Sequence, residues 1–189
     1  MPRLYFLAVS KRAAQAARGL VILVVFVVAL PLKGFACDAL PTNLSREITR
    51  RYPSWAVAQL SDLGADDQQL FLAAHGAGAC PGIARGRFVG TNDRAYAILL
   101  RKGGNGRLHE MVLVAQPSKG DFELRVALAD TPTSRPAVIV SVPPGQYSAV
   151  GNEAKVRLTF EGIRYEVIEA GASLIYWDKD RFAHVVIGE

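Results

Sequence analysis

Two neighbouring stretches of the chain are apolar at almost every position, residues 95–101 and residues 108–115. Successive side chains of a strand point to opposite faces, so strands of this kind are buried on both faces. The connection between them, residues 102–107, contains three glycines, which suit a reversal that needs positive φ. The pattern predicts an antiparallel hairpin at the centre of a sheet.

Later segments instead alternate apolar with polar positions, which is typical of strands with one buried face and one wetter face. We expect the Glu161-Gly162 pair to form a tight turn between two of these strands. Together with the central hairpin they make seven or eight strands at roughly ten-residue intervals, the rhythm of an antiparallel β protein. The segments are residues 121–129, 137–142, 155–160, 163–167, 172–177 and 182–187.

Helical spacing is confined to the N-terminal side of these strands. Apolar residues recur at every fourth position in residues 44–52, and Thr42 or Asn43 is suited to cap that helix. A weaker helix is predicted over residues 66–74, which begin with two acids. The fold class predicted is therefore α+β with β dominant, an antiparallel sheet of about seven strands with one or two short N-terminal helices.

The first 36 residues have the composition of a secretory signal peptide. Basic residues precede an uncharged apolar run, residues 20–32, which is short for a membrane span of about 20 residues. Gly34-Phe35-Ala36 follows, with small residues where signal peptidase requires them. We expect residues 1–36 to be removed and residues 37–189 to form one periplasmic or secreted domain; an uncleaved anchor is the alternative.

Removal of this segment changes the charge of the protein. The whole chain has 22 basic and 17 acidic residues. Five of the basic residues lie in residues 1–36, which contain no acid, so the mature chain has a formal net charge of zero. The high pI is thus no sign of nucleic-acid binding, and no stable membrane insertion is expected after cleavage. The five residues are Arg3, Lys11, Arg12, Arg18 and Lys33.

Cys37 and Cys80 are the two cysteines of the chain. An even pair in an exported protein predicts a disulfide. Closing a loop of this length stabilises by about 4 kcal/mol in the chain-entropy model. The alternative is lipidation of Cys37, but the preceding residues lack the leucine usual in that signal, and lipidation would leave Cys80 unpaired.

Residues 86–97 resemble the calcium loop of FG-GAP or VCBS-type repeats in secreted bacterial proteins. The family scaffold is matched by Gly86, Phe88, Gly90, Tyr96 and Ala97. Where the family has carboxylates, this chain has Arg87, Val89, Thr91 and Ala95. Calcium requires six to eight oxygen ligands, so the resemblance implies a metal-free loop of similar shape. It covers about twelve residues, and without a repeat it does not imply a propeller.

The sequence contains no familiar catalytic or cofactor motif. His75, His109 and His184 lie far apart, without the spacing of a zinc site, and no serine-nucleophile or dinucleotide-binding motif is present. We therefore expect no cofactor and no metal. Asp178 and Asp180, which flank Lys179, are better explained as a solvated turn than as a glycosidase pair. His75, in a glycine-rich segment near two aspartates, is the candidate if the protein is a hydrolase.

Adjacent aromatic residues near the C-terminus are the candidate binding residues. Tyr176 and Trp177 follow each other in a predicted strand, so their side chains point to opposite faces. One of them is exposed unless both faces of the sheet are covered. Exposed Trp and Tyr side chains commonly anchor a protein or a sugar, although core packing is the simpler role.

The sequence favours an exported cell-envelope binding protein without catalytic activity, of the inhibitor or immunity type. A secreted hydrolase that uses His75 and a carbohydrate-binding module that uses Tyr176 or Trp177 are the alternatives. The partner would be a protein or an envelope polysaccharide.

The predicted processing is testable by intact mass of the exported protein. We expect a chain that begins at Cys37, and a mass that rises by two hydrogens on reduction because the disulfide opens. A diacyl or triacyl increment on Cys37 would show the lipoprotein alternative instead. A chain that still carries residues 1–36 would show that the segment is an anchor.

Overall fold

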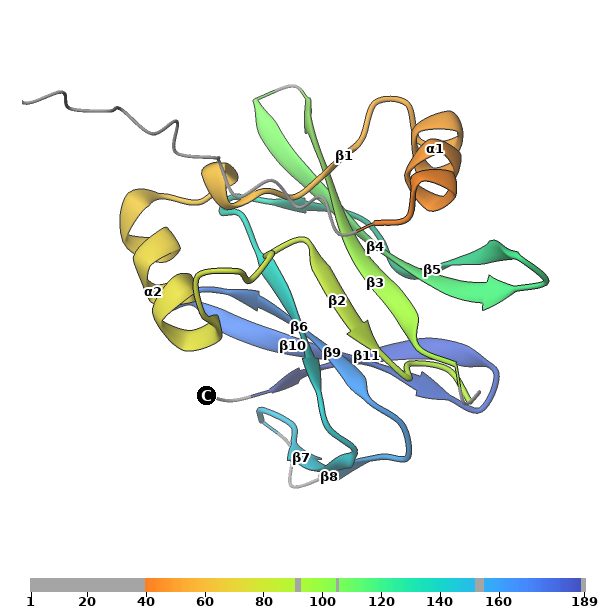
Figure 1. Ribbon diagram of the computed structural model, residues 1–189. Helices are drawn as coiled ribbons and strands as arrows, with labels where there is room; N and C mark the ends of the chain where they lie inside the picture. Colours follow the sequence, from red (N-terminus) through yellow and green to blue (C-terminus); the bar gives the residue numbers. More distant parts are fainter. Residues whose placement is uncertain (1–39, 91–92, 105, 152–154, 188–189) are drawn as a thin grey trace, which may run out of the picture. The chain divides into compact units, whose positions relative to one another are not determined.

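The computed structural model describes residues 40–90, 93–104, 106–151 and 155–187 (Figure 1). These belong to one compact unit, Lys33–Glu189, while the other unit, Met1–Leu32, lies outside the described residues. The elements in chain order are α1 (Thr42–Arg51), β1 (Ala56–Val57), the 3-10 helix η1 (Leu60–Asp62), α2 (Ala65–His75), β2 (Ile83–Gly86), β3 (Ala95–Gly104), β4 (Arg107–Ser118), β5 (Asp121–Thr133), β6 (Val138–Val142), β7 (Gly145–Ser148), β8 (Lys155–Leu158), β9 (Gly162–Val167), β10 (Gly171–Asp178) and β11 (Arg181–Ile187). The predicted α+β class with β dominant is confirmed.

The strands form two main antiparallel sheets and a separate hairpin. The first sheet has the order β1-β3-β4-β5, with β2 paired to the same edge of β3 as β1. The second sheet has the order β11-β10-β9-β6, and β7 pairs with β8. The strands β2 and β6 lie side by side, and so do β5 and β11, so each main sheet meets the other along both edges.

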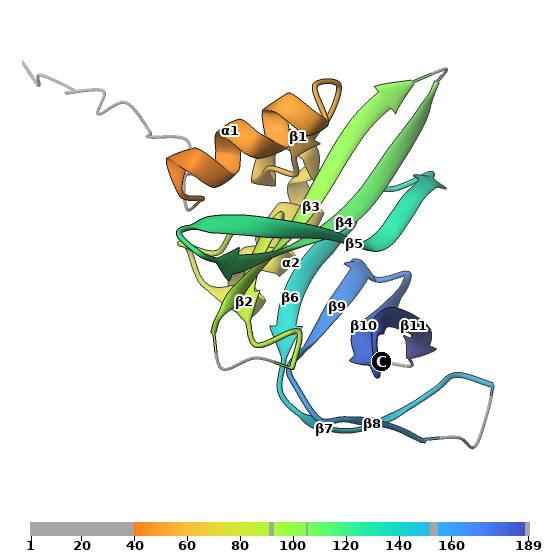
Figure 2. The same ribbon diagram turned by 90° about the vertical axis from the view of Figure 1, so that its right-hand side faces the viewer.

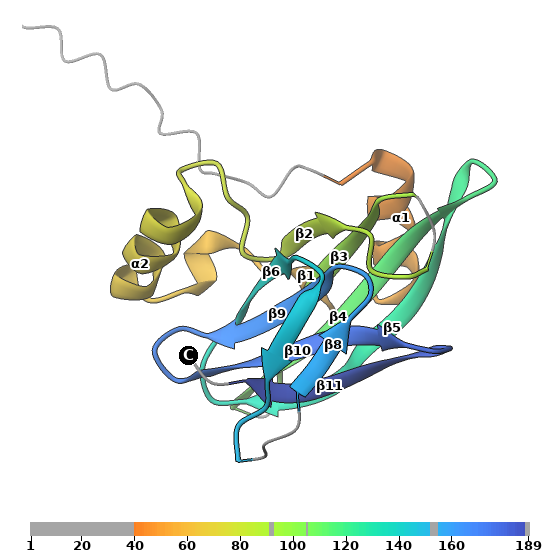
Figure 3. The same cartoon turned by 90° about the horizontal axis from the view of Figure 1, so that it is seen from below.

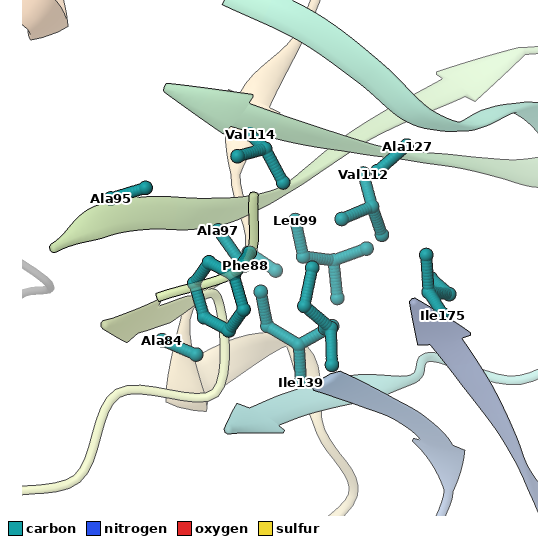
Figure 4. Packing of buried hydrophobic residues seen from close by; sticks show 12 residues of the cluster. Ala84, Phe88, Ala95, Ala97, Leu99, Val112, Val114, Ala127, Ile139 and Ile175 are labelled. Atoms are coloured by element: carbon teal, nitrogen blue, oxygen red, sulfur yellow. The ribbon is translucent and has the colours of Figure 1, made fainter. Parts of the chain in front are cut away.

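The central hairpin of the first sheet, β3 and β4, is buried on both faces as its sequence predicts. Leu99 and Val112 point into the space between the two sheets, where they meet Ile139 and Ile175 of the second sheet (Figure 4). The intervening side chains, such as Leu100, point to the opposite face. Two faces of one hairpin thus supply the inner core and an outer one.

Helix α1 covers the outer face of this hairpin (Figure 2). Its fully buried Leu44 and Ile48 pack against Ile98, Leu100 and Leu113. The helix begins after Pro41, with no side-chain cap, so the expected capping by Thr42 or Asn43 is wrong: both residues are already inside the first turn. No helix in the described part of the chain is both long enough and apolar enough to cross a bilayer.

The second sheet is also covered on its outer face, by two different elements (Figure 3). Helix α2 packs through Phe71 on Val138 and Ile168 at one end. The β7–β8 hairpin packs at the other end through Leu158, which contacts a cluster that includes Leu174. The central strands of both sheets therefore have protein on each side.

One edge of β3 changes partner at Leu99. The backbone N–H of Ala58 donates to the carbonyl of Leu99, and the N–H of Leu99 donates to the carbonyl of Gly82. The segments that carry β1 and β2 therefore come into close contact here. A Cβ added to Gly82 would lie 2.2 Å from the carbonyl oxygen of Ala58, so glycine is required at this crossing.

The expected hairpin turn at Glu161-Gly162 is wrong. β8 pairs with β7, whereas β9 pairs with β10 and β6, so the two strands that this turn would join belong to different sheets. Both segments have the alternation of a strand, and alternation does not say which strand is the partner. The short strands β1, β2 and β7 were not expected from the pattern; β1 has only two residues, too few for a period to be visible.

We expect that Leu99→Ala lowers the free energy of unfolding by about 2–5 kcal/mol, because Leu99 is fully buried between the sheets and the change leaves a cavity. Val126→Ala is the matched control, because Val126 is 48% exposed on β5; its effect should stay within about 0.5 kcal/mol. Urea denaturation measures both. Equal effects of the two substitutions would contradict this account of the core.

Candidate functional site

One candidate site lies beside α2. A pocket of about 430 Å³ opens between this helix and the outer face of the second sheet. It combines an apolar floor with a polar rim, which is the usual character of binding pockets. The lining residues are Leu70, Phe71, Ala74, His75, Val138, Glu166, Ile168 and Glu169.

The sequence of α2 explains why this pocket has an exposed apolar residue. Leu70, Phe71 and Leu72 are consecutive, and consecutive helical residues are rotated by about 100°. They cannot all face the sheet. Phe71 is 2% exposed and fills the space against the sheet, whereas Leu70 is 42% exposed at the mouth of the pocket. The helix thus buries one large side chain and presents another to solvent.

Arg135 holds α2 to the sheet next to this pocket. Its guanidinium donates to the carbonyl oxygen of Ile168 at 3.0 Å and lies 3.5 Å from the carboxylate of Asp67 on α2. Asp67 is in the first turn of the helix, where a carboxylate is favoured by the helix dipole. The helix therefore contacts the sheet through both an apolar side chain, Phe71, and the polar contacts of Arg135.

A second pocket, of about 310 Å³, lies on the other side of Phe71 and His75. Both pockets share these two residues, whose rings are in contact with centroids 4.9 Å apart. The second pocket extends over the seam between β2 and β6 and reaches Cys80. We call the two pockets together the α2 groove.

His75 lies in the α2 groove with two carboxylates, Glu166 and Glu169, in the same lining. Among the described residues, however, no hydrogen bond or ion pair joins the imidazole to either carboxylate. The carboxylate of Glu166 is instead 2.9 Å from Nε of Arg164. The described residues also contain no group of His, Cys, Asp and Glu arranged to hold a metal ion. A general base is usually oriented by a hydrogen-bond partner. His75 lies in a pocket, but none of the described carboxylates is bonded to its imidazole.

Tyr176 and Trp177 point to opposite faces of β10, and both are half-buried. Tyr176 packs on the outer cluster beneath the β7–β8 hairpin. Trp177 stacks between the guanidinium of Arg125, 5.1 Å from its ring centroid, and Phe182, 5.0 Å away. Coverage of both faces of this sheet removes the exposed aromatic that the sequence suggested. Their assignment as binding residues stays a prediction.

The other two histidines are on strands, as expected. His109 Nδ1 lies 2.7 Å from a carboxylate oxygen of Asp130, whose second oxygen accepts from Lys102. Hydrogen bonds from Lys102 and from His109 hold the pKa of Asp130 below its usual range. No hydroxyl or thiol of the described residues is bonded to His109, so this pair lacks a nucleophile. His184 is exposed on β11.

The interior contains a polar network that was not expected from the sequence. Glu110 is completely buried, and its carboxylate accepts from Arg101 Nε at 2.8 Å, from the backbone of Ala137 at 3.1 Å and from the Tyr165 hydroxyl at 2.5 Å. Arg101 also lies 2.8 Å from Asp62 of η1. Both carboxylate oxygens of Glu110 accept hydrogen bonds, so the network holds the two sheets together and compensates the burial of the charge.

Tyr165 shows the electrostatic effect of this network. Burial raises the pKa of its hydroxyl, and the hydrogen bond to the Glu110 carboxylate raises it further, because ionisation would place two negative charges side by side. The hydroxyl therefore stays protonated and continues to donate.

Three predictions involve residues outside the described part of the chain. The predicted signal peptide, residues 1–36, lies there and stays a prediction. Cys37 lies there, so the disulfide to Cys80 stays a prediction. Thr91 of the FG-GAP-like stretch lies there too. The described part of that stretch joins β2 to β3, with Phe88 and Val89 buried. Its likeness to a calcium loop stays a prediction.

Comparison with known proteins adds no relative: no family model matches the chain, and neither a curated protein nor a solved structure gives a significant match.

Sequence reasoning placed His75 near acids, but the acids that line its pocket are others. It considered Asp66 and Asp67, whereas the pocket brings Glu166 and Glu169 from the β9–β10 region. These glutamates are about 90 residues further along the chain, and no spacing rule links them to α2. The signal that could have been used is the run of three large apolar residues in α2, which forces Leu70 outward.

We expect the stability of the protein to fall as pH rises above about 10, the usual pKa of tyrosine. A raised pKa in the folded state means that the unfolded chain loses the Tyr165 proton first, so high pH favours unfolding. Tyr165→Phe should lose stability at pH 7 yet show a shallower decline above pH 10. Tyr147, whose pKa burial also raises, is present in both proteins. Urea midpoints against pH measure the difference, and parallel curves would contradict it.

Proposed function

We propose that this chain is an exported binding protein of the cell envelope, without catalytic activity, and that it docks a protein partner in the α2 groove. The inhibitor or immunity type of factor fits this proposal, because such proteins act by occupying a partner. The proposal depends on the predicted signal peptide for the location and on the α2 groove for the contact.

The observation that carries it is the exposed Leu70 at the mouth of an apolar pocket. A large apolar side chain that is 42% exposed beside Ala74 and Ile168 gives a partner an apolar surface to bury. Interfaces draw most of their affinity from a few such anchors in desolvated pockets. The helix contacts the sheet through Phe71 and Arg135, so docking requires little reordering.

Charge indicates the chemistry of the partner. The lining of the first pocket of the α2 groove, beside Leu70, includes Glu166 and Glu169 and no described lysine or arginine; Arg85 lines the second pocket. Glu169 lies at an exposed turn with positive φ, and no ion pair to it is found among the described residues. An apolar side chain flanked by a lysine or arginine would fill the pocket and complement its rim. We therefore expect a partner segment of that composition.

Hydrolysis is the second candidate, because His75 and two carboxylates line one pocket. It requires a rearrangement that brings the imidazole to a carboxylate, as can occur when a substrate binds. Binding requires no such rearrangement and is the better-supported function. A carbohydrate-binding role for Tyr176 or Trp177 has less support, since both side chains are half-buried.

The docking proposal predicts that Leu70→Arg weakens partner capture by at least about tenfold, because it removes the anchor and adds charge repulsion. Val186→Arg is the matched control: Val186 is 54% exposed on β11, outside the lining of the α2 groove. Tagged protein is used to capture partners from envelope extract, and the captured proteins are quantified for wild type and both variants.

A protein captured by wild type and Val186→Arg but not by Leu70→Arg supports docking in the groove. Equal capture by both variants would show that the groove is not the contact. His75→Ala separates the hydrolase candidate: it should keep partner capture, whereas loss of a substrate turnover seen in the wild type would replace binding by catalysis as the function.

A further inference from the structure

A further pocket, lined by two arginines, lies away from the α2 groove. It has a volume of about 340 Å³ and forms where three connections converge: the segment after β2, the Pro143-Pro144 turn before β7, and the segment between β8 and β9. Its lining residues are Arg87, Arg94, Pro143, Pro144, Thr159, Phe160 and Glu161. None of them lines the α2 groove.

The one acid in this lining, Glu161, is already bound to the protein. One carboxylate oxygen accepts from the backbone N–H of Arg87 at 2.7 Å, and the other accepts from the Ser141 hydroxyl at 3.2 Å. The backbone N–H of Glu161 in turn donates to the carbonyl of Arg87 at 3.1 Å. These bonds fix two of the three connections against each other and direct the carboxylate to main-chain and hydroxyl donors rather than to a guanidinium.

The guanidinium groups of Arg87 and Arg94 have no acidic partner within ion-pair distance among the described residues, and this includes the neighbouring Asp93. Some other arginines are paired, for instance Arg50 with Glu47 and Arg164 with Glu166. Arg46, Arg107, Arg157 and Arg181, like the two pocket arginines, have no ion pair among the described residues. Two guanidinium groups and one carboxylate leave a local charge of about +1 in the pocket. Such a pocket attracts an anion.

The remaining walls are apolar and rigid. Pro143 and Pro144 form one side, and the half-buried ring of Phe160 forms another. A Cβ added to Gly90 would lie 3.3 Å from that ring, so the backbone at Gly90 packs closely against Phe160 and restricts its position. Thr159 adds a hydroxyl that can donate to an oxyanion. The pocket thus combines two guanidinium groups with an apolar wall.

We propose that this arginine pocket binds a phosphoryl or sulfate oxyanion whose carrier packs against Phe160. The guanidinium fork matches the oxygens of a phosphate in a bidentate manner, and two forks suit a dianion better than a carboxylate. The volume is at the lower end for small-ligand sites, so it accommodates an anionic headgroup or a small phosphorylated ring. The proposal is independent of partner docking at α2.

The experiment titrates the purified exported protein with inorganic phosphate and with phenyl phosphate, and follows the amide signals of Thr159 and Phe160 by NMR. We expect saturable binding, tighter for phenyl phosphate because its ring contacts Phe160. Arg87→Gln and Arg94→Gln should each weaken binding about tenfold. Arg46→Gln removes the same charge from the exposed surface of α1 and should leave binding unchanged.

A vesicle-binding experiment distinguishes the two sources of the anion, a lipid headgroup and a soluble ligand. Sedimentation with phosphatidic acid vesicles, compared with phosphatidylcholine vesicles, tests a lipid headgroup; binding of phenyl phosphate without vesicle binding indicates a soluble ligand. Either result supports the site if it is lost in Arg87→Gln and kept in Arg46→Gln. Absence of saturable binding in both arms, or equal weakening by Arg46→Gln, overturns it. Both pocket arginines are exposed, so their variants should fold, and circular dichroism checks this.

Discussion

The requirement to cover both faces of the β3–β4 hairpin organises the rest of this protein. Neither strand has a polar face along its central part, so the hairpin cannot lie at the surface of a single sheet in water. The second sheet covers one face and α1 covers the other. The second sheet then has an outer face of its own, which α2 and the β7–β8 hairpin cover. Each layer covers apolar surface that the layer beneath it would leave exposed. The α2 groove lies where the outermost layer, α2 and the β7–β8 hairpin, leaves the second sheet incompletely covered.

The Glu110 network gives this layered packing a fixed arrangement. Apolar contacts alone tolerate small displacements between sheets, whereas a buried carboxylate that lost one donor would carry a large desolvation penalty. Glu110 lies on β4 next to irregularities in its pairing with β5, so its donors arrive from β3, from the start of β6 and from β9. The network therefore relates the first sheet to the second by hydrogen bonds with defined directions.

The fold class, both helices and most of the strands were predictable because they depend on local periodicity. Strand partners were not: nothing in the alternation of residues 155–167 shows that β8 turns toward β7 instead of β9. The same limit applies to sites. The exposure of Tyr176 and Trp177 depends on whether a distant hairpin covers the sheet, and the residues around His75 come from α2, β6 and the β9–β10 region. Arg87 and Arg94 look like ordinary surface residues until the connections that surround them are placed.

The contact of the two main sheets along both edges has a consequence for assembly. A strand at an open edge offers unpaired N–H and C=O groups, and another chain can add to it. Here β2 lies beside β6, β5 lies beside β11, and a bridge from Ala149 to Ile187 occupies part of the outer side of β11. Self-association by strand addition, the first step toward amyloid-like aggregation, therefore has few places to begin.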